Sequence, residues 1–168
     1  LPGGFGTCDE AFEVLPLIQT GKTRLVPVIL LDVPGGSYWK TWEGFVRGEM
    51  VRQELISAED VHLYSVTETA EDAAREILDF YRVFHSQRVV GDQLVLRVRR
   101  PLSEQTLAQL QREFDDILKG PVEQGSGPLP AEADEYPNLP RLVLPFNRTS
   151  YGRLRQLIDS LNKSGPSA

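Results

Sequence analysis

The sequence feature that most constrains the fold is the apolar run VPVILL at residues 26–31, which ends at Asp32. A strand that is apolar at every position is buried on both faces, as in the parallel sheets of α/β proteins. The segment PGGS at residues 34–37 follows it and is typical of a turn at the carboxyl end of a strand. The run therefore predicts a parallel strand in an α/β fold.

Helix and strand patterns alternate around this run throughout residues 1–86. The spacing of apolar residues predicts helices over about 7–20, 41–52 and 69–84, and a second strand over residues 61–66. Short connections join these elements, which is the organisation of an α/β domain. We therefore expect residues 1–86 to form a helix-covered parallel sheet.

Capping signals mark the ends of the first predicted helix. Thr7, followed three residues later by Glu10, has the spacing of a capping box. Gly21 is the residue type expected just beyond the end of a helix. Pro16 lies inside the helical pattern and is expected to kink it, because its ring displaces a backbone hydrogen bond. These signals predict a helix that starts at Thr7 and ends before Gly21.

Residues 87–168 have a different pattern and are expected to form a small α+β extension. The order of its elements is predicted as β-α-β-α, with a Pro-, Gly- and acid-rich loop at residues 121–140. The first strand, within residues 89–100, alternates Leu94, Leu96 and Val98 with a second face that includes Arg97. This alternation predicts that Arg97 is exposed.

Composition excludes several classes of function. The 168 residues carry a net charge of −6 and no basic block, so nucleic acid is not expected as a partner. One cysteine and two histidines leave little material for a metal site, and none is expected. No apolar run approaches the roughly 20 residues of a membrane span. We therefore expect a cytoplasmic protein that binds neither nucleic acid nor membrane.

The chain opens directly on a glycine-rich segment, Pro2-Gly3-Gly4-Phe5-Gly6-Thr7. Such a loop normally follows a buried strand that fixes its direction. We therefore expect this sequence to be the C-terminal part of a longer protein.

The same segment has two interpretations from its residues alone. Glycines let backbone N–H groups approach a phosphate closely, and the N-terminus of the following helix adds about half a positive charge. A plain tight turn is the alternative interpretation. Neither the Walker pattern, which needs a lysine, nor the Gly-x-Gly-x-x-Gly dinucleotide pattern fits the segment. Glu10 likewise has two interpretations, a capping-box residue or a carboxylate beside the sugar of a bound nucleotide.

The nine residues from Pro2 to Glu10 match the PGGxGTxxE motif, and the chain resembles the Lonely guy (LOG) family of phosphoribohydrolases, often named lysine decarboxylases. The likeness continues through the segments Phe12-Glu13, Gln19-Thr20-Gly21-Lys22, Pro27–Leu31, Tyr38-Trp39, Ile56-Ser57 and Asp60. It covers roughly residues 1–85.

The resemblance implies the C-terminal half of a Rossmann-like parallel sheet and a homodimer of the full-length protein. It implies hydrolysis of the N-glycosidic bond of a nucleoside 5′-monophosphate, such as AMP or a cytokinin riboside monophosphate, to free base and ribose 5-phosphate, without a cofactor. By that resemblance the phosphate-binding residues are Gly3, Gly4, Gly6 and Thr7, and the catalytic residue is Glu10. The family also uses an arginine upstream of the motif, which this sequence does not contain, so the fragment alone is expected to be inactive.

Two other classes of function remain open at this stage. The chain could be a non-catalytic nucleotide or cofactor carrier that uses the same loop, or a sensor in which the extension matters most. A lysine decarboxylase would need a lysine that binds pyridoxal phosphate, and Lys22 and Lys40 fit solvated positions better. Trp39 and Trp42 follow a strand-end turn and could line a base pocket, although core packing explains them as well.

Overall fold

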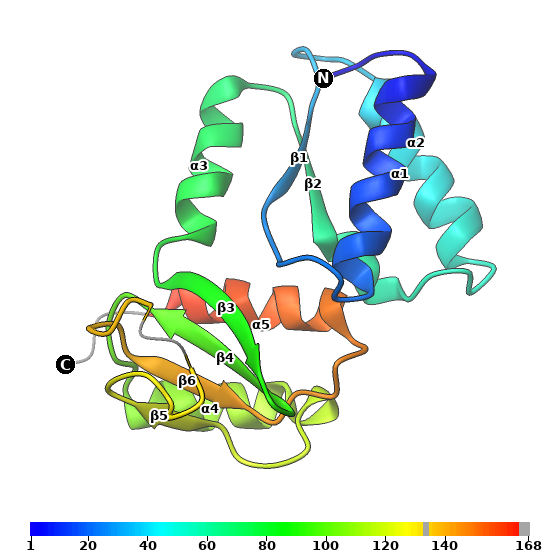
Figure 1. Ribbon diagram of the computed structural model, residues 1–168. Coiled ribbons are helices and arrows are strands. Elements are labelled where there is room, and N and C mark those ends of the chain that lie inside the picture. The colour runs from blue at the N-terminus through cyan, green and yellow to red at the C-terminus, as the bar shows by residue number, and fades with distance from the viewer. Residues whose placement is uncertain (133–134, 165–168) are drawn as a thin grey trace. The chain divides into compact units, whose positions relative to one another are not determined.

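The computed structural model describes residues 1–132 and 135–164 and has a mixed α/β fold (Figure 1). In chain order its elements are α1 (Phe5–Gln19), β1 (Val28–Leu31), α2 (Tyr38–Phe45), the π-helical η1 (Val46–Val51), the 3₁₀-helical η2 (Ala58–Leu63), β2 (Tyr64–Thr67), α3 (Ala70–Phe80), β3 (Phe84–Val90), β4 (Gln93–Val98), α4 (Glu104–Glu113), the 3₁₀-helical η3 (Asp115–Ile117), β5 (Glu123–Gly125), β6 (Arg141–Leu144) and α5 (Tyr151–Lys163). The chain divides into two compact units. One comprises residues 1–78 with 148–155, and the other comprises residues 79–147 with 156–168.

The first unit contains the strand predicted from the apolar run. β1 pairs in parallel with β2, from Val28 opposite Tyr64 to Leu31 opposite Thr67. Helix α3 lies on one side of this pair, and α1 and α2 lie on the other (Figure 1). The parallel, helix-covered arrangement confirms the expected α/β class for this part of the chain.

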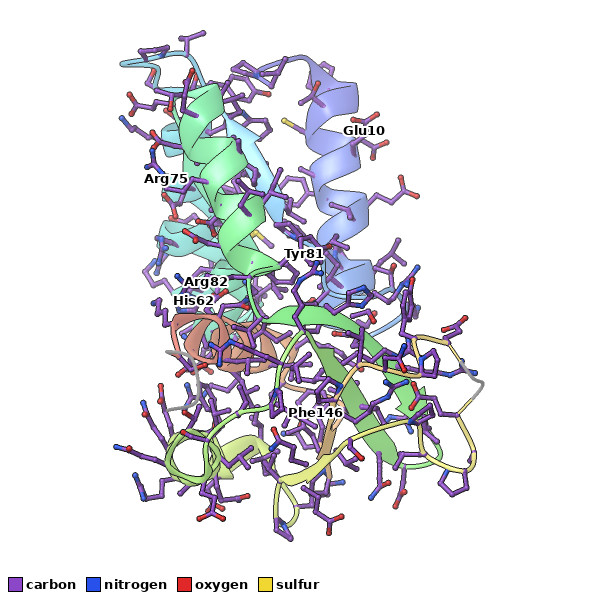
Figure 2. All side chains as sticks on the ribbon, turned by 90° about the vertical axis from the view of Figure 1, so that its left-hand side faces the viewer. Glu10, His62, Arg75, Tyr81, Arg82 and Phe146 are labelled. Carbon is purple, nitrogen blue, oxygen red and sulfur yellow. The ribbon has the colours of Figure 1, made fainter. Side chains whose placement is uncertain are left out.

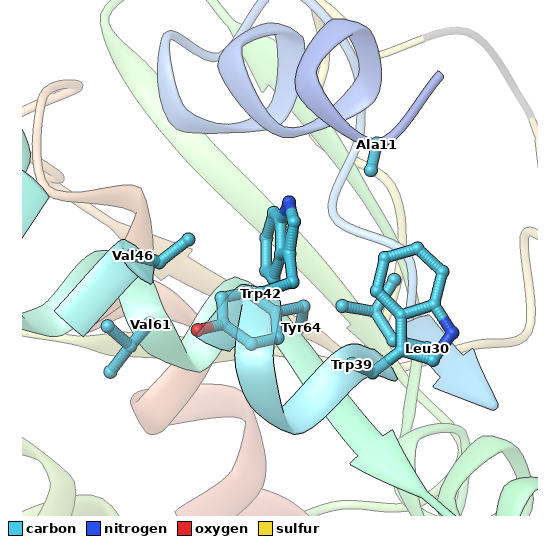
Figure 3. Close-up of a cluster of buried hydrophobic side chains, with 7 residues drawn as sticks. All are labelled: Ala11, Leu30, Trp39, Trp42, Val46, Val61 and Tyr64. Carbon is cyan, nitrogen blue, oxygen red and sulfur yellow. The ribbon is translucent and has the colours of Figure 1, made fainter. Parts of the chain in front are cut away.

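An aromatic cluster forms the core between the two helices and the strands. Trp39 and Trp42 are 1% and 9% exposed and meet edge to face, and Trp42 meets Tyr64 in the same way (Figure 3). Ala11 of α1 and Leu30 of β1 belong to the same buried cluster. Both tryptophans are therefore core residues, as the simpler of their two sequence interpretations predicts.

The ends of α1 agree only in part with the capping signals. Gly21 lies just beyond the helix with φ +68°, and the N–H of Lys22 donates to the carbonyl of Leu17, so the predicted glycine end is confirmed. The predicted start is wrong, because the helix begins at Phe5 with Gly4 as its N-cap and no side chain caps it. The Thr7–Glu10 capping box is therefore not formed.

The second unit has a different order of elements from the predicted β-α-β-α extension. Its sheet has four antiparallel strands in the order β3-β4-β6-β5, so the element order is β-β-α-β-β-α. The predicted helix over residues 69–84 ends at Phe80, and β3 begins at Phe84. Gly91, with φ +62°, makes the turn into β4, and β5 lies within the loop predicted at residues 121–140.

A buried ionic network replaces the exposed arginine predicted on β4. Arg97 is 3% exposed, and its Nη2 lies 2.6 Å from Oε1 of Glu132. Arg141 of β6 donates from Nη2 to the same oxygen at 3.1 Å. The prediction of an exposed Arg97 is wrong because Glu132, 35 residues away, supplies the countercharge that lets an arginine be buried.

The same unit is held together by the buried side chain of Asn162 in α5. Its Oδ1 accepts from the N–H groups of Val83 and Phe84 at 2.8 and 2.9 Å, and its Nδ2 donates to the carbonyl of Phe80 at 2.6 Å. The Asn162 side chain thus supplies hydrogen-bond partners to backbone groups at the end of α3 and the start of β3.

Among the described residues, no helix is both long and apolar enough to cross a bilayer, and no group of three His, Cys, Asp or Glu side chains could hold a metal ion.

Replacement of Asn162 by alanine should lower the free energy of unfolding by about 3 kcal/mol, because three buried backbone groups lose their partners. Chemical denaturation of the full chain measures this. The exposed Asn138→Ala is the matched control and should change stability by less than about 0.5 kcal/mol. Equal effects of the two variants would contradict the anchoring role.

Acid should weaken the second unit through Glu132. Burial raises the pKa of this carboxyl, but hydrogen bonds from Arg141 and Arg97 outweigh burial and leave its pKa below the ordinary 4.5. Its contribution to stability is therefore present above about pH 4.5 and is lost as the pH falls toward the lowered value.

Glu132→Gln should reduce the free energy of unfolding at pH 7 by about 3 kcal/mol, since two buried guanidinium groups lose the buried carboxylate that they share. It should also flatten the loss of stability below pH 4.5, as measured by urea denaturation at several pH values. The exposed Glu123→Gln serves as the control. Parallel pH profiles for wild type and Glu132→Gln would refute the assignment.

Candidate functional site

The start of α1 brings four of the five predicted site residues together. Gly3 and Gly4 precede the helix, and Gly6 and Thr7 are its second and third residues. The N–H of Thr7 donates to the carbonyl of Gly4 at 3.1 Å, as does that of Cys8 at 3.4 Å. Within the described part of the chain, no group accepts from the N–H groups of Gly4, Phe5 or Gly6. Three backbone donors thus point out of the positive end of a fifteen-residue helix.

The three glycines differ in what surrounds them. A Cβ on Gly3 would lie 2.1 Å from Oγ1 and 2.9 Å from Cβ of Thr7, so the Thr7 side chain is packed over this residue. A Cβ on Gly4 or on Gly6 would meet no atom within 4 Å. Packing against Thr7 therefore requires glycine at position 3. At positions 4 and 6 no atom covers the glycine, and the backbone N–H groups stay open.

Glu10 lies one turn beyond Gly6 on the same face of α1, because residues four apart in a helix share a face. Its side chain is exposed on the outer side of the helix near the N-terminal end (Figure 2). Helical Cα–Cβ bonds tilt toward the N-terminus, so this carboxylate leans toward the turn that begins at Gly6. Among the described residues, Glu10 makes no hydrogen bond or ion pair. A carboxylate without a partner is available to a ligand at the open glycines.

The glycine loop lies at the carboxyl end of the parallel strands. Tyr38, the first residue of α2, donates its hydroxyl to the carbonyl of Gly3 at 2.8 Å. α2 follows the turn after β1, so this bond fixes the loop beside the ends of the strands. Ligands of open α/β sheets bind at this edge. Tyr38 is a residue of the site that sequence reasoning missed, since the contact joins residues 35 apart.

The neighbouring helix N-terminus is already occupied. Asp32, 5% exposed, accepts from the N–H of Trp39 in α2 at 3.1 Å and from the N–H of Val33 at 2.9 Å. A carboxylate of the chain thus fills the position that an anion would take at α2. Among the residues that the structure describes, no such internal anion lies at the start of α1, which makes it the better anion site of the two.

A second ion pair lies at the same edge, between Lys40 of α2 and Glu68, which follows β2. The Lys40 hydrogen bond, helped by the N–H of Gly35, holds the pKa of Glu68 below its usual value. The same bond raises the pKa of Lys40 and keeps its amine protonated.

Two hollows in the described surface lie away from this loop. An apolar cavity of about 60 Å³ is lined by the second half of α1 together with residues such as Trp42, Met50 and Tyr64. A wider, open hollow of about 580 Å³ is lined by Gln19, Val51 and residues 54–59. Neither includes a predicted site residue.

Comparison with known proteins bears on what such a site does. Residues 1–77 match the model of a protein family described as "Possible lysine decarboxylase". The match covers this first part of the chain, a little under half of its length. The match contains the whole PGGxGTxxE motif and confirms the LOG-family resemblance predicted from it. The comparison with curated proteins found no match.

The decarboxylation chemistry suggested by that description does not fit the residues. It requires a lysine whose neutral amine can form an imine with pyridoxal phosphate. Residues 1–77 contain two lysines, Lys22 and Lys40. Lys40 is held protonated by Glu68, and Lys22 is exposed just beyond the end of α1. Neither is placed as an imine-forming residue.

Alanine at Gly3 and alanine at Gly6 should have opposite effects on stability. Gly3→Ala should lower the free energy of unfolding by about 1–3 kcal/mol, because its methyl group would overlap Thr7. Gly6→Ala should raise it by up to about 1 kcal/mol, since alanine favours the helix and meets no atom. Thermal and chemical unfolding test this. Destabilisation by Gly6→Ala would show that the open space is filled in solution.

Proposed function

We propose that the chain carries the phosphate-binding loop and the catalytic glutamate of a nucleoside 5′-monophosphate phosphoribohydrolase. The observation that carries the proposal is the pair formed by three open N–H donors at the start of α1 and the unpartnered Glu10 one turn later on the same face. One helical turn is about 5.4 Å, which is comparable to the span from the 5′-phosphate to the ribose ring of a nucleotide. The family match supports the same reaction class.

The phosphate would bind the N–H groups of Gly4, Phe5 and Gly6, where the helix dipole favours negative charge. Thr7, whose side chain lies over Gly3, would border the same site through its hydroxyl. Phe5 is 98% exposed beside these donors and offers an aromatic face for the base. No metal or organic cofactor is needed for these steps. The proposed substrate is a purine monophosphate such as AMP, including the cytokinin riboside type.

Glu10 would act at the ribose. As the bond from C1′ to the base nitrogen breaks, its electron pair leaves with the base and positive charge develops on the sugar ring. The Glu10 carboxylate stabilises this charge and orients the attacking water. Water forms the new bond to C1′ and gives up a proton, and the base leaves protonated. The products are free base and ribose 5-phosphate.

The Rossmann-like domain and the homodimer, which come from the family resemblance, belong to the same proposal, and so does the cytoplasmic location expected from the composition. The family's upstream arginine would complete the site. The activity assay therefore uses the full-length protein, in which the segment before the motif is present.

Glu10→Gln in the full-length protein should leave AMP affinity within about threefold of wild type and lower the rate of base release at least about 100-fold, since a neutral amide stabilises the developing cation poorly. Chromatography of free adenine and ribose 5-phosphate measures the rate. The control is Glu13→Gln, an exposed acid on the same helix, which should retain full activity.

The outcomes separate the proposal from its rival. Wild-type protein that binds AMP but releases no base would support the non-catalytic carrier instead. A Glu10→Gln variant as fast as wild type would remove Glu10 from the mechanism. Failure of AMP to bind at all would overturn both.

A further inference from the structure

A chain of hydrogen bonds connects Cys8, Tyr38 and the glycine loop. The Tyr38 hydroxyl lies 2.8 Å from the carbonyl oxygen of Gly3 and 3.2 Å from the sulfur of Cys8. A carbonyl oxygen can only accept, so the single phenolic proton goes to Gly3. The thiol of Cys8 is then the donor to the Tyr38 oxygen. The order is therefore thiol to hydroxyl to carbonyl, from α1 through α2 back to the loop.

This chain controls the direction of one backbone donor. In a trans peptide the C=O and the following N–H point in opposite directions. The Gly3 carbonyl points at Tyr38, so the N–H of Gly4 must point away from it. A peptide between two glycines can rotate as a unit more easily than any other, because neither residue has a Cβ. Without Tyr38, a rotated peptide would present a carbonyl oxygen where the donor stands now.

We propose that Tyr38 is a positioning residue that aims the N–H of Gly4 at the phosphate of the nucleotide. This inference rests on the proposed function and deepens it. Its role is selective for the anion, because a rotated Gly3–Gly4 peptide would replace an attractive dipole at the phosphate by a repulsive one. The parts of the nucleotide beyond the phosphate do not depend on it.

Cys8 supports the same hydrogen-bonded arrangement. Its thiol occupies one side of the Tyr38 oxygen and leaves the phenolic proton directed at Gly3. Serine at position 8 can replace the thiol as a donor, whereas alanine cannot.

The test compares Tyr38→Phe with a matched removal of another phenol oxygen. Tyr64→Phe is the control, because the Tyr64 hydroxyl is buried without a hydrogen-bond partner in the described part of the chain. AMP and adenosine affinities are measured by calorimetry on the full-length protein. Tyr38→Phe should weaken AMP binding about five- to tenfold, the value of one hydrogen bond, and leave adenosine binding unchanged. Tyr64→Phe should change neither affinity.

A second readout does not depend on any ligand. The amide proton resonance of Gly4, measured by NMR in the ligand-free protein, should shift in Tyr38→Phe and in Cys8→Ala. It should remain at the wild-type position in Tyr64→Phe, and Cys8→Ser should restore most of the Cys8→Ala change. A general loss of structure would move resonances throughout the first unit rather than those of the loop alone.

Each result has one meaning. If wild type does not bind AMP, the proposed function fails, and the Gly4 resonance alone decides whether Tyr38 holds the peptide. If wild type binds AMP and Tyr38→Phe binds AMP and adenosine as wild type does, the inference is overturned while the proposed function stands. Equal weakening of AMP and adenosine would also overturn it, because the effect would not belong to the phosphate.

Discussion

The candidate site depends on the packing of α1 and α2 against the two parallel strands. The buried cluster around Trp39, Trp42 and Tyr64 fixes the two helices to β1 and β2. Because this core is made of large rings that meet edge to face, small shifts of either helix would open voids in it. The glycine loop has little packing of its own, so its position is inherited from this core through Tyr38.

The two helix N-termini at this edge of the sheet show how one structural element is used in two ways. At α2 the N–H of Trp39 donates to the Asp32 carboxylate, so this helix start is capped from within the chain. At α1 no described side chain caps the helix, and its exposed N–H donors remain available to an anion. An uncapped, exposed helix start beside a well-packed core is compatible with a binding role, since a side-chain cap would compete with an anion for these donors.

Local signals in the sequence predicted the elements that local forces decide. The continuous apolar run gave β1, and Ser103 and Thr69 cap α4 and α3 as their positions indicate. The start of α1 was predicted two residues late, because the carbonyl of Gly4 accepts from both Thr7 and Cys8 and no side-chain cap is needed. The hairpin of β3 and β4 was missed although Gly91-Asp92 is a known turn signal, since the helical pattern was carried through Phe84.

Contacts between residues distant in sequence could not be predicted in this way. The burial of Arg97 depends on Glu132, and the direction of the glycine loop depends on Tyr38. For the site, the sequence placed Gly3, Gly4, Gly6 and Thr7 together at a helix start because they are adjacent along the chain. It could not show that the Thr7 side chain occupies the space beside Gly3 while the space beside Gly4 and Gly6 stays open, since this depends on side-chain directions.

Helix α5 has a consequence for how the chain reaches its native state. Its first residues, together with residues 148–150, are counted in the first unit, and the remainder belongs to the second. A ribosome must therefore synthesise the chain as far as residue 155 before the unit that carries the glycine loop is complete. For the same reason, truncation after residue 86 would remove part of that domain as well as the extension, and loss of binding in such a fragment would not assign the binding to the extension.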